Sequence, residues 1–244
     1  MKLILIFGLI FIGFFNPMKT SAYELSIGSR FSQNAVIYQL FEMFRGIIKC
    51  GDADKNVPVM DPYKFNLEKA QLQAVINAEL NITNGVVTGL SDFRLEDFVF
   101  KKDEVSLDVV IKIPVIKLDS EYYEMEGKIL EIFPIAGTGF LYVIAKDVTI
   151  YSRLYLKQST NGKCVVIDRL ENTSFTVDKI LSHTEFDKNI DNVLNAIIED
   201  LLAGYLTRFS KFISKTYEGY VVSMLNEVLN KYETWSILAT ILHK

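Results

Sequence analysis

The sequence predicts an α+β fold in which a highly curved antiparallel β-sheet wraps a long C-terminal helix, with a second helix near the N-terminus. Apolar residues recur at helical spacing over residues 187–232, and apolar and polar residues alternate over most of residues 64–177. Several alternating stretches exceed the usual strand length of about five or six residues. Because long antiparallel strands twist and coil, we expect this sheet to roll around the helix that covers its apolar face.

The apolar stripe of residues 187–232 drifts around the predicted helix. Most steps between its apolar residues, such as Ile190, Leu194 and Ile198, are four residues long, and each step overshoots a full turn by roughly 40°. A helix that lies on one surface keeps its stripe on one side. The drift therefore predicts either an enclosed helix or two helices that face differently. Gly204 and Gly219 are the expected break points, because glycine weakens a helix interior.

The remaining elements follow from periodicity and turn signals. A helix is expected over residues 29–50, followed by a loop at 51–62 that is rich in Asp, Gly and Pro. Asn84-Gly85 and Asn161-Gly162 predict hairpin turns, Gly137 and Gly139 bracket a further turn, and Pro114 marks a bulge or a sheet edge. Alternation predicts strands at residues 72–82, 105–115, 123–131, 140–156 and 164–177.

Residues 1–22 have the pattern of a secretory signal peptide. A positive start at Lys2, an apolar stretch at 3–15 and small residues at 20–22 precede the expected cleavage site. An uncleaved anchor is the alternative, but the apolar stretch is shorter than the ~20 residues of a spanning helix. We expect a secreted, extracellular protein with a single domain over residues 23–244 and no stable membrane span.

Charge and motif content argue against several classes of function. The net charge is −4 and no basic stripe is present, which argues against nucleic acid and against adsorption to anionic membranes. The two histidines, His183 and His243, lack the partners of a nucleophilic triad or a metal motif, and His183 is expected in a loop. We therefore expect no enzyme, no metal and no cofactor. Hydrolysis of small esters through His183 is the enzymatic alternative.

Cysteines and sequons suggest covalent modifications. Cys50 and Cys164 are the two cysteines of the chain, and in a secreted protein an even number predicts a disulfide. Two free thiols are the alternative. Asn81 and Asn172 each begin an N-x-S/T sequon and are candidate glycosylation sites.

A series of short motifs points to a known family. Residues 57–62 read V-P-V-M-D-P, residues 84–93 read N-G-V-V-T-G-L-S-D-F, and residues 135–140 read I-A-G-T-G-F. With the Pro and Tyr-x-x-x-Gly pattern at 113–128, their order and spacing resemble the insect takeout/haemolymph juvenile-hormone-binding family over roughly residues 30–232. The chain lacks the close cysteine pair that members usually carry before or within the first helix.

The resemblance implies a tubular lipid-binding fold with an elongated hydrophobic tunnel. It implies carriage of a small lipophilic ligand, such as a terpenoid hormone or a fatty acid, in haemolymph or sensory tissue. A protein- or membrane-interaction module of the same fold, without a small ligand, is the alternative. The apolar tail at residues 235–244 would then contact a protein partner; otherwise it docks over one mouth of the tunnel or is frayed.

If the tunnel exists, apolar side chains from the first helix, one strand and the long helix are expected to line it, with tyrosines as polar contacts. The candidate ligand-binding residues are Val36, Leu40, Phe44, Leu72, Ile76, Leu80, Tyr123, Tyr142, Leu194, Ile198, Leu202 and Phe209.

Overall fold

The computed structural model describes residues 33–72, 76–129, 132–185 and 191–242. The predicted signal peptide at 1–22 lies outside the described residues. In chain order the elements are α2 (Gln33–Cys50), the short 3₁₀ helix η1 (Ala53–Lys55), β1 (Tyr63–Leu72), β2 (Ile76–Thr88), the 3₁₀ helix η2 (Leu90–Asp92), β3 (Arg94–Lys101), β4 (Ser106–Ile129), β5 (Phe133–Gln158), β6 (Val165–Thr184), α3 (Asp191–Arg208), α4 (Ser210–Leu229) and α5 (Trp235–Leu242).

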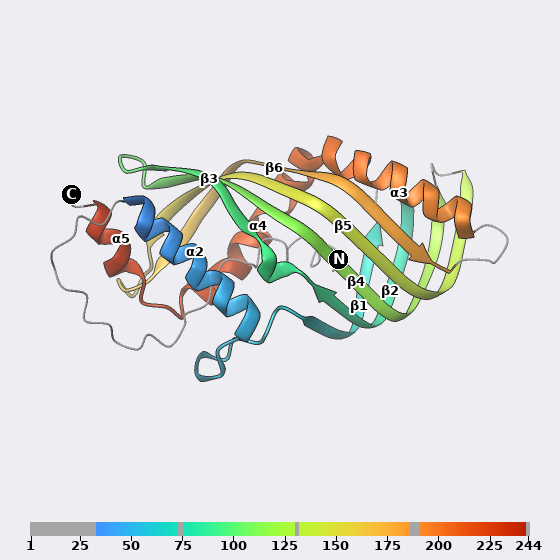
Figure 1. Ribbon diagram of the computed structural model, residues 1–244, viewed down its shortest axis with the longest axis horizontal. Helices are drawn as coiled ribbons and strands as arrows, with labels where there is room; N and C mark the ends of the chain where they lie inside the picture. The colour runs from blue at the N-terminus through green and yellow to red at the C-terminus, as the bar shows by residue number, and fades with distance from the viewer. Residues whose placement is uncertain (1–32, 73–75, 130–131, 186–190, 243–244) are drawn as a thin grey trace.

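The strands form one strongly curved antiparallel sheet (Figure 1). Its order is β1-β2-β4-β5-β6, and β3 also pairs with β4. Strands β4, β5 and β6 contain 24, 26 and 20 residues, which confirms the prediction of unusually long strands. The α+β class, the curved sheet and the helix preceding it are as the sequence predicts.

Strand β4 changes its partner near Pro114. Its pairing with β2 ends at Lys117, and its pairing with β3 begins at Lys112. Proline has no N–H to donate to a neighbouring strand, so a central strand accepts it where the ladder is interrupted. The interruption predicted at Pro114 is therefore the point where one neighbouring strand replaces another.

The long strands also change which of their residues face the core. In β4 the buried apolar residues fall at odd positions from Leu107 to Ile113, and the buried residues fall at even positions from Ile116 to Ser120. In β5 the change occurs at Asp147, which has a φ of 49°. An extra residue on one side of a strand bends it and increases its twist. These shifts keep one apolar face turned inward while the sheet curves.

The C-terminal helical segment is divided into two helices. Helix α3 ends at Arg208 and α4 begins at Ser210, with Phe209 between them at φ −98° and ψ 9°. Two differently facing helices were one of the two predicted alternatives. The predicted break points are wrong, because Gly204 and Gly219 lie inside the helices, and a Cβ added there would meet nothing within 4 Å.

Helices α3 and α4 run along the outer edge of β6, the last strand of the sheet (Figure 1). A strand edge carries N–H and C=O groups that need partners. Side chains of the two helices supply these partners, so the helices take the place of a further strand. Thr207 Oγ1 accepts from Val177 N at 2.9 Å, Glu199 from Ser182 N at 2.8 Å, Glu218 from Leu170 N at 3.1 Å, and Asn226 bonds both Ile167 N and Ile167 O at 2.8 Å.

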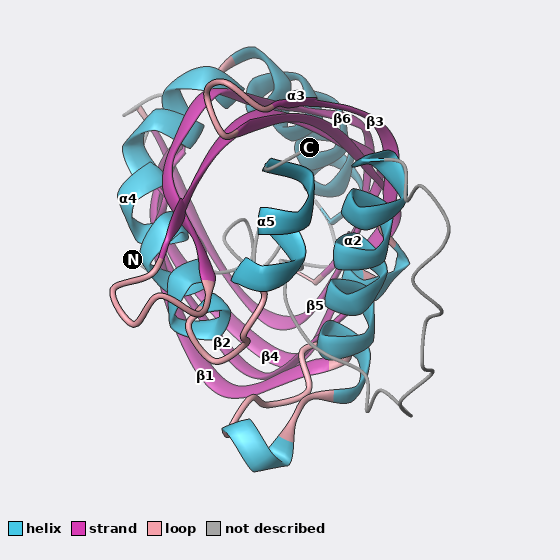
Figure 2. Cartoon of the chain, turned by 90° about the vertical axis from the view of Figure 1, so that its left-hand side faces the viewer, coloured by secondary structure: helices cyan, strands magenta, loops and turns pink. Residues whose placement is uncertain are grey.

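One end of the curved sheet holds α2 and α5. In the end-on view the strands form most of a ring, and α5 lies within it beside α2 (Figure 2). Leu238 and Ile241 of α5 are 0% and 2% exposed. Trp235 N donates to Lys163 O at 2.9 Å, which fixes the start of α5 to the β5–β6 turn. The described part of the C-terminal tail is therefore docked on the chain's own core, and the frayed alternative is wrong.

Several predicted turns and loops have a different structure. The hairpin at Asn161-Gly162 is confirmed, since β5 and β6 flank it and Gly162 has a φ of 76°. Asn84-Gly85 instead lies inside β2, where Asn84 has a φ of 51°. A positive φ suits a bulge as well as a turn, so the dipeptide alone does not distinguish them. Gly137 and Gly139 likewise lie inside β5, and His183 lies in β6.

Three of the predicted strands have different limits in the structure. The strand predicted at 72–82 spans a chain reversal, because β1 ends at Leu72 and β2 begins at Ile76. Conversely, β4 joins the two strands predicted at 105–115 and 123–131 into one. Alternation identifies extended backbone, but it does not show whether a polar gap is a turn or a bulge.

Candidate ligand-binding interior

The loop after α2 is anchored by Asp61. Its carboxylate accepts hydrogen bonds from Gly89 N at 3.0 Å, Ser91 N at 2.7 Å and Ser91 Oγ at 2.6 Å. Gly89 has a φ of 92°, and a Cβ there would lie 2.0 Å from the carbonyl oxygen of Val115. The D-P and G-L-S motifs of the sequence therefore meet in one contact, which holds α2 against the sheet.

Six of the candidate ligand-binding residues share one apolar core. Four of them are buried, and Leu40 and Leu202 are partly buried and pack against the same core. The buried four are Val36 and Phe44 on α2, Leu80 on β2 and Tyr123 on β4. For Leu72, Ile76, Leu194 and Ile198 the structure describes the backbone alone, in β1, β2 and α3, so their side chains lie outside the described part.

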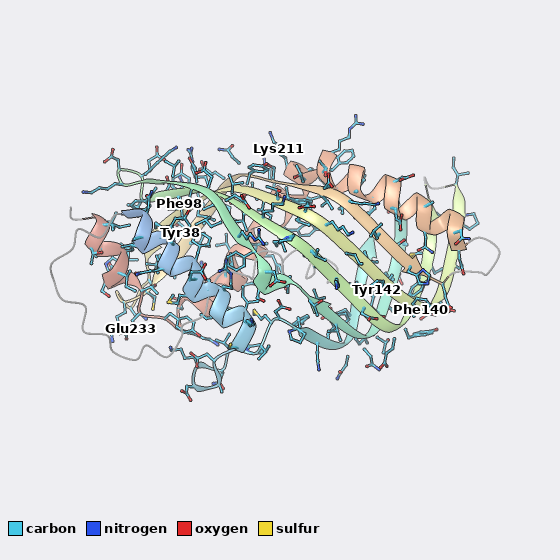
Figure 3. The ribbon with its side chains drawn as sticks, in the orientation of Figure 1. Tyr38, Phe98, Phe140, Tyr142, Lys211 and Glu233 are labelled. Atoms are coloured by element: carbon cyan, nitrogen blue, oxygen red, sulfur yellow. The ribbon has the colours of Figure 1, made fainter. Side chains whose placement is uncertain are left out.

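Tyr142 and Phe209 are not brought into this core. Tyr142 lies between Leu141 and Val143, which both contact the core, so its side chain lies on the opposite face of β5 (Figure 3). The alternation of β5 changes phase at Asp147, and a single phase extended from the second half of the strand put Tyr142 on the wrong face. Phe209 is 41% exposed at the α3–α4 junction, where its ring lies 4.7 Å from that of Tyr205.

Tyr123 has a polar role inside the molecule. It is 1% exposed, and its hydroxyl donates to the carbonyl oxygen of Glu185. Burial, together with the charges of Asp191 and Glu185, raises the pKa of this phenol well above its ordinary value. The hydroxyl therefore remains protonated and ties the end of β6 to β4. Its donor serves the fold and is not free to orient a ligand.

A polar cluster that sequence reasoning missed lies where β1 approaches α4. Glu68 of β1 is 8% exposed. Burial raises the pKa of Tyr63 and that of Tyr220 on α4, and the charge of Glu68 raises both further. The signal for Glu68 was present in the sequence, because two-residue alternation from Leu72 back through Ala70 puts Glu68 on the same face.

Helix α4 also carries Ser214, whose hydroxyl has no hydrogen-bond partner among the described residues. The Oγ atom of Ser214 is buried there without a recorded donor or acceptor. A hydroxyl that is buried unpaired costs about 1–3 kcal/mol, so such a group is satisfied readily by a ligand or a water molecule. Ser214 is therefore the candidate polar contact that this side of the interior offers.

The predicted disulfide between Cys50 and Cys164 is wrong, and both thiols are free. Cys164 is buried after the β5–β6 turn and donates to the carbonyl oxygen of Asn230 at 3.3 Å. Cys50 is exposed at the last turn of α2. An even cysteine count gives no information on whether two Cβ atoms can approach within bonding range.

A surface groove of about 510 Å³ lies between α3 and β6. Charged side chains border it, among them Asp178, Lys179, Glu199, Asp200 and Arg208. It is not the predicted tunnel, because none of the candidate ligand-binding residues lines it.

The remaining predictions concern glycosylation, metal binding and membrane-spanning helices. Asn172 is exposed in β6 with a φ of 54°, and Asn81 is partly buried in β2, so both sequons remain candidate sites. Within the described residues, no three His, Cys, Asp or Glu side chains gather as a metal would require. None of the helices in that part of the chain combines the length and the apolar character of a membrane span.

Comparison with known proteins gives one family and two related structures. The profile of the family described as haemolymph juvenile hormone binding protein (JHBP) matches residues 13–239. Takeout 1 of Epiphyas postvittana is similar in structure, with a TM-score of 0.48 and 18% identity, over 82% of this chain and 87% of that one. A lipopolysaccharide binding protein has a TM-score of 0.35 and 16% identity, over 78% of this chain and 39% of that one. No curated protein sequence matches significantly.

Proposed function

Because the chain belongs to the haemolymph juvenile hormone binding protein family, we propose that it is a secreted, single-domain carrier of a small lipophilic ligand. The ligand would be held between the concave face of the sheet and helix α3. The family supports lipophilic-ligand binding in general. The terpenoid or fatty-acid nature of the ligand, secretion after cleavage near residue 22 and a domain over 23–244 are parts of this proposal.

The observation that carries the proposal is the incomplete burial of apolar side chains toward α3. Leu202 and Tyr205 of α3, Val143 and Ala145 of β5 and Met125 of β4 all pack against the core, yet each is only partly buried. Exposed apolar area is unfavourable by about 25 cal/mol per Å². A bound apolar molecule that covers these side chains would recover this energy, which is the usual basis of lipid carriage.

Two polar features support a ligand with one polar end. Ser214 Oγ is buried without a recorded partner, and Glu68 lies near the hydroxyl-bearing Tyr63 and Tyr220. A hydroxyl, ester or carboxylic acid at one end of an apolar ligand would match a few such groups in a mostly apolar interior.

The test is native mass spectrometry of the secreted protein, followed by extraction and identification of the molecules it holds. We expect a bound apolar small molecule and saturable displacement of an apolar fluorescent probe by it. A matched pair of variants locates the site, since Leu202→Ala should weaken the binding of the probe and Leu67→Ala, at a 50% exposed leucine of β1, should not. Protein that releases no apolar molecule and binds no probe would overturn the proposal.

An enzymatic function has little support from the geometry. His183 is exposed on β6, where its ring lies 5.5 Å from that of Phe140. A nucleophilic triad requires a carboxylate and a nucleophile on either side of the imidazole. We therefore keep binding, and not catalysis, as the proposed activity.

A further inference from the structure

The α3–α4 junction exposes aromatic side chains on the outside of the molecule. Phe209 is 41% exposed and Phe212 is 71% exposed. Exposed phenylalanines that lie together on one surface are characteristic of contact with a partner or a membrane. The carrier function proposed above does not use this surface, because both residues face away from the sheet interior.

Basic residues surround these two rings. Arg208, Lys211 and Lys215 are exposed, and the sequence has no acidic residue between Asp200 and Glu218. None of the ion pairs recorded among the described residues involves these three cations. Arg208 also borders the α3–β6 groove, whose charged lining includes three acidic residues and one lysine, so Lys211 and Lys215 are the less compensated charges.

The attachment of the helices to β6 fixes the direction in which this surface faces. Thr207 and Glu218 bond the backbone of β6 on either side of the junction. The exposed residues at the start of α4 therefore lie on the side of this helix away from the sheet, and Lys211 lies on that outer surface (Figure 3). We call Arg208, Phe209, Lys211, Phe212 and Lys215 the junction surface.

We propose that the junction surface docks the protein on anionic lipid membranes. Each lysine or arginine near an anionic bilayer contributes about 1 kcal/mol of attraction, and an aromatic ring beside it inserts among the headgroups. The whole chain has a net charge of −4, so its other faces are repelled from the same bilayer. The local cluster therefore gives one docking orientation, which the net charge alone would not suggest.

The experiment measures co-sedimentation of the protein with large unilamellar vesicles. We expect binding to vesicles of phosphatidylcholine mixed with phosphatidylserine, little binding to phosphatidylcholine alone, and release by high salt. Lys211→Gln with Lys215→Gln should reduce the partition coefficient roughly 30-fold. Phe212→Ala should reduce it several-fold while leaving the residual binding salt-sensitive.

Two control variants match these changes. Lys102→Gln with Lys117→Gln removes two exposed lysines elsewhere, one in the β3–β4 turn and one in β4, and Tyr122→Ala removes a 47% exposed ring of β4. Neither should alter vesicle binding. Equal binding to neutral and anionic vesicles, or equal losses in the control variants, would overturn the proposal. Because the readout is vesicle binding and not cargo, its failure leaves the carrier proposal standing, and the reverse also holds.

Discussion

The two ends of the curved sheet bury their apolar residues to different extents. At the α2–α5 end, Ile47, Ile48, Leu229 and Leu238 are each 0–1% exposed, and α5 fills the interior of the ring (Figure 2). Toward α3, Ala203 and Leu206 are buried at 8% exposure each, but other apolar residues that contact the core, such as Leu202 and Val143, are only partly buried. Two helices thus complete one end of the interior, whereas the other end is left with apolar surface that a ligand would cover.

The two ends also differ in the hydrogen bonds that hold their helices in place. At the α2–α5 end, side chains link segments far apart in the chain: Arg45 Nη2 bonds Phe93 O at 2.7 Å and Lys231 Nζ bonds Asn56 O at 3.0 Å. Helix α3 is attached to its neighbour in sequence, β6, where Glu199 and Asn195 bond Ser182 and Thr207 bonds Val177. We infer that the α2–α5 end sets the stability of the fold, and that α3 can adjust to a ligand at smaller cost.

Among the substitutions that test this comparison, one at the α2–α5 end should have the largest effect on the free energy of unfolding. Leu238→Ala removes a fully buried side chain and should lower the free energy of unfolding by about 3 kcal/mol, from lost burial and the remaining cavity. Urea unfolding monitored by circular dichroism measures it. Ile237→Ala, at the neighbouring residue that is 36% exposed, is the control and should cost much less. Equal costs would show that α5 is not packed as described.

The contact between α4 and the edge of β6 should give the next largest effect on stability. Asn226→Ala leaves the N–H and C=O of Ile167 without their side-chain partner, which should cost about 2 kcal/mol. Hydrogen exchange should show faster exchange of the Ile167 amide, with Ser223→Ala, at an exposed position of α4, as the control. An unchanged exchange rate would mean that the helix does not act as the partner of this strand edge.

Leu202→Ala sharpens the comparison of the ends, because it makes the same chemical change as Leu238→Ala at a partly buried site. We expect a loss of about 1 kcal/mol in stability, since less surface is involved, together with weaker binding of an apolar probe. Parallel unfolding and probe titrations of both variants measure the contrast. If Leu202→Ala costs as much stability as Leu238→Ala, the proposed difference between the ends is wrong.

The smallest expected effect concerns pH and the outer surface of the α2–α5 end. Hydrogen bonds from Arg153 lower the pKa of Asp108 below its ordinary value, with Lys101 adding to the shift, and Arg153 Nη2 lies 3.0 Å from Asp108 Oδ2. A lowered carboxyl pKa stabilises the fold above the unfolded pKa of about 3.9, and this stability is lost as the pH falls.

The Asp108→Asn variant tests this expectation. It should be slightly less stable than the natural chain at neutral pH, and the difference should shrink as the pH falls below about 4. Thermal unfolding across a pH series measures it. A difference that is independent of pH would show that the lost contact is not electrostatic.

Periodicity predicted the type of most elements, because burial of one face imposes a repeat on any helix or strand. It did not locate the points where the repeat changes phase. Asn84 and Asp147 take positive φ values inside strands, where a sequence reading expects turns or uninterrupted alternation. Asn161-Gly162 carries the same signal as Asn84-Gly85, and only the former is a hairpin. The difference arises from pairing with distant strands, which local residues do not encode.

Periodicity likewise predicted some residues of the candidate site and missed others. Val36, Phe44 and Leu80 lie in the core because their own helix or strand has a clear apolar face. Phe209 belonged to the helical repeat, but the chain breaks at this residue and turns it outward. The role of Glu199 and Asn226 at the edge of β6 gave no signal, since a polar residue that bonds a strand edge looks like any solvent-facing one.

The covered edge of β6 has a consequence for behaviour at high concentration. A bare strand edge is a template on which another polypeptide adds a strand, and chains of such additions grow into aggregates. The amides of Ile167, Leu170, Val177 and Ser182 are already occupied by helix side chains. A second copy of the protein therefore finds these groups closed to pairing, and crowding alone does not start polymer growth from this side of the molecule.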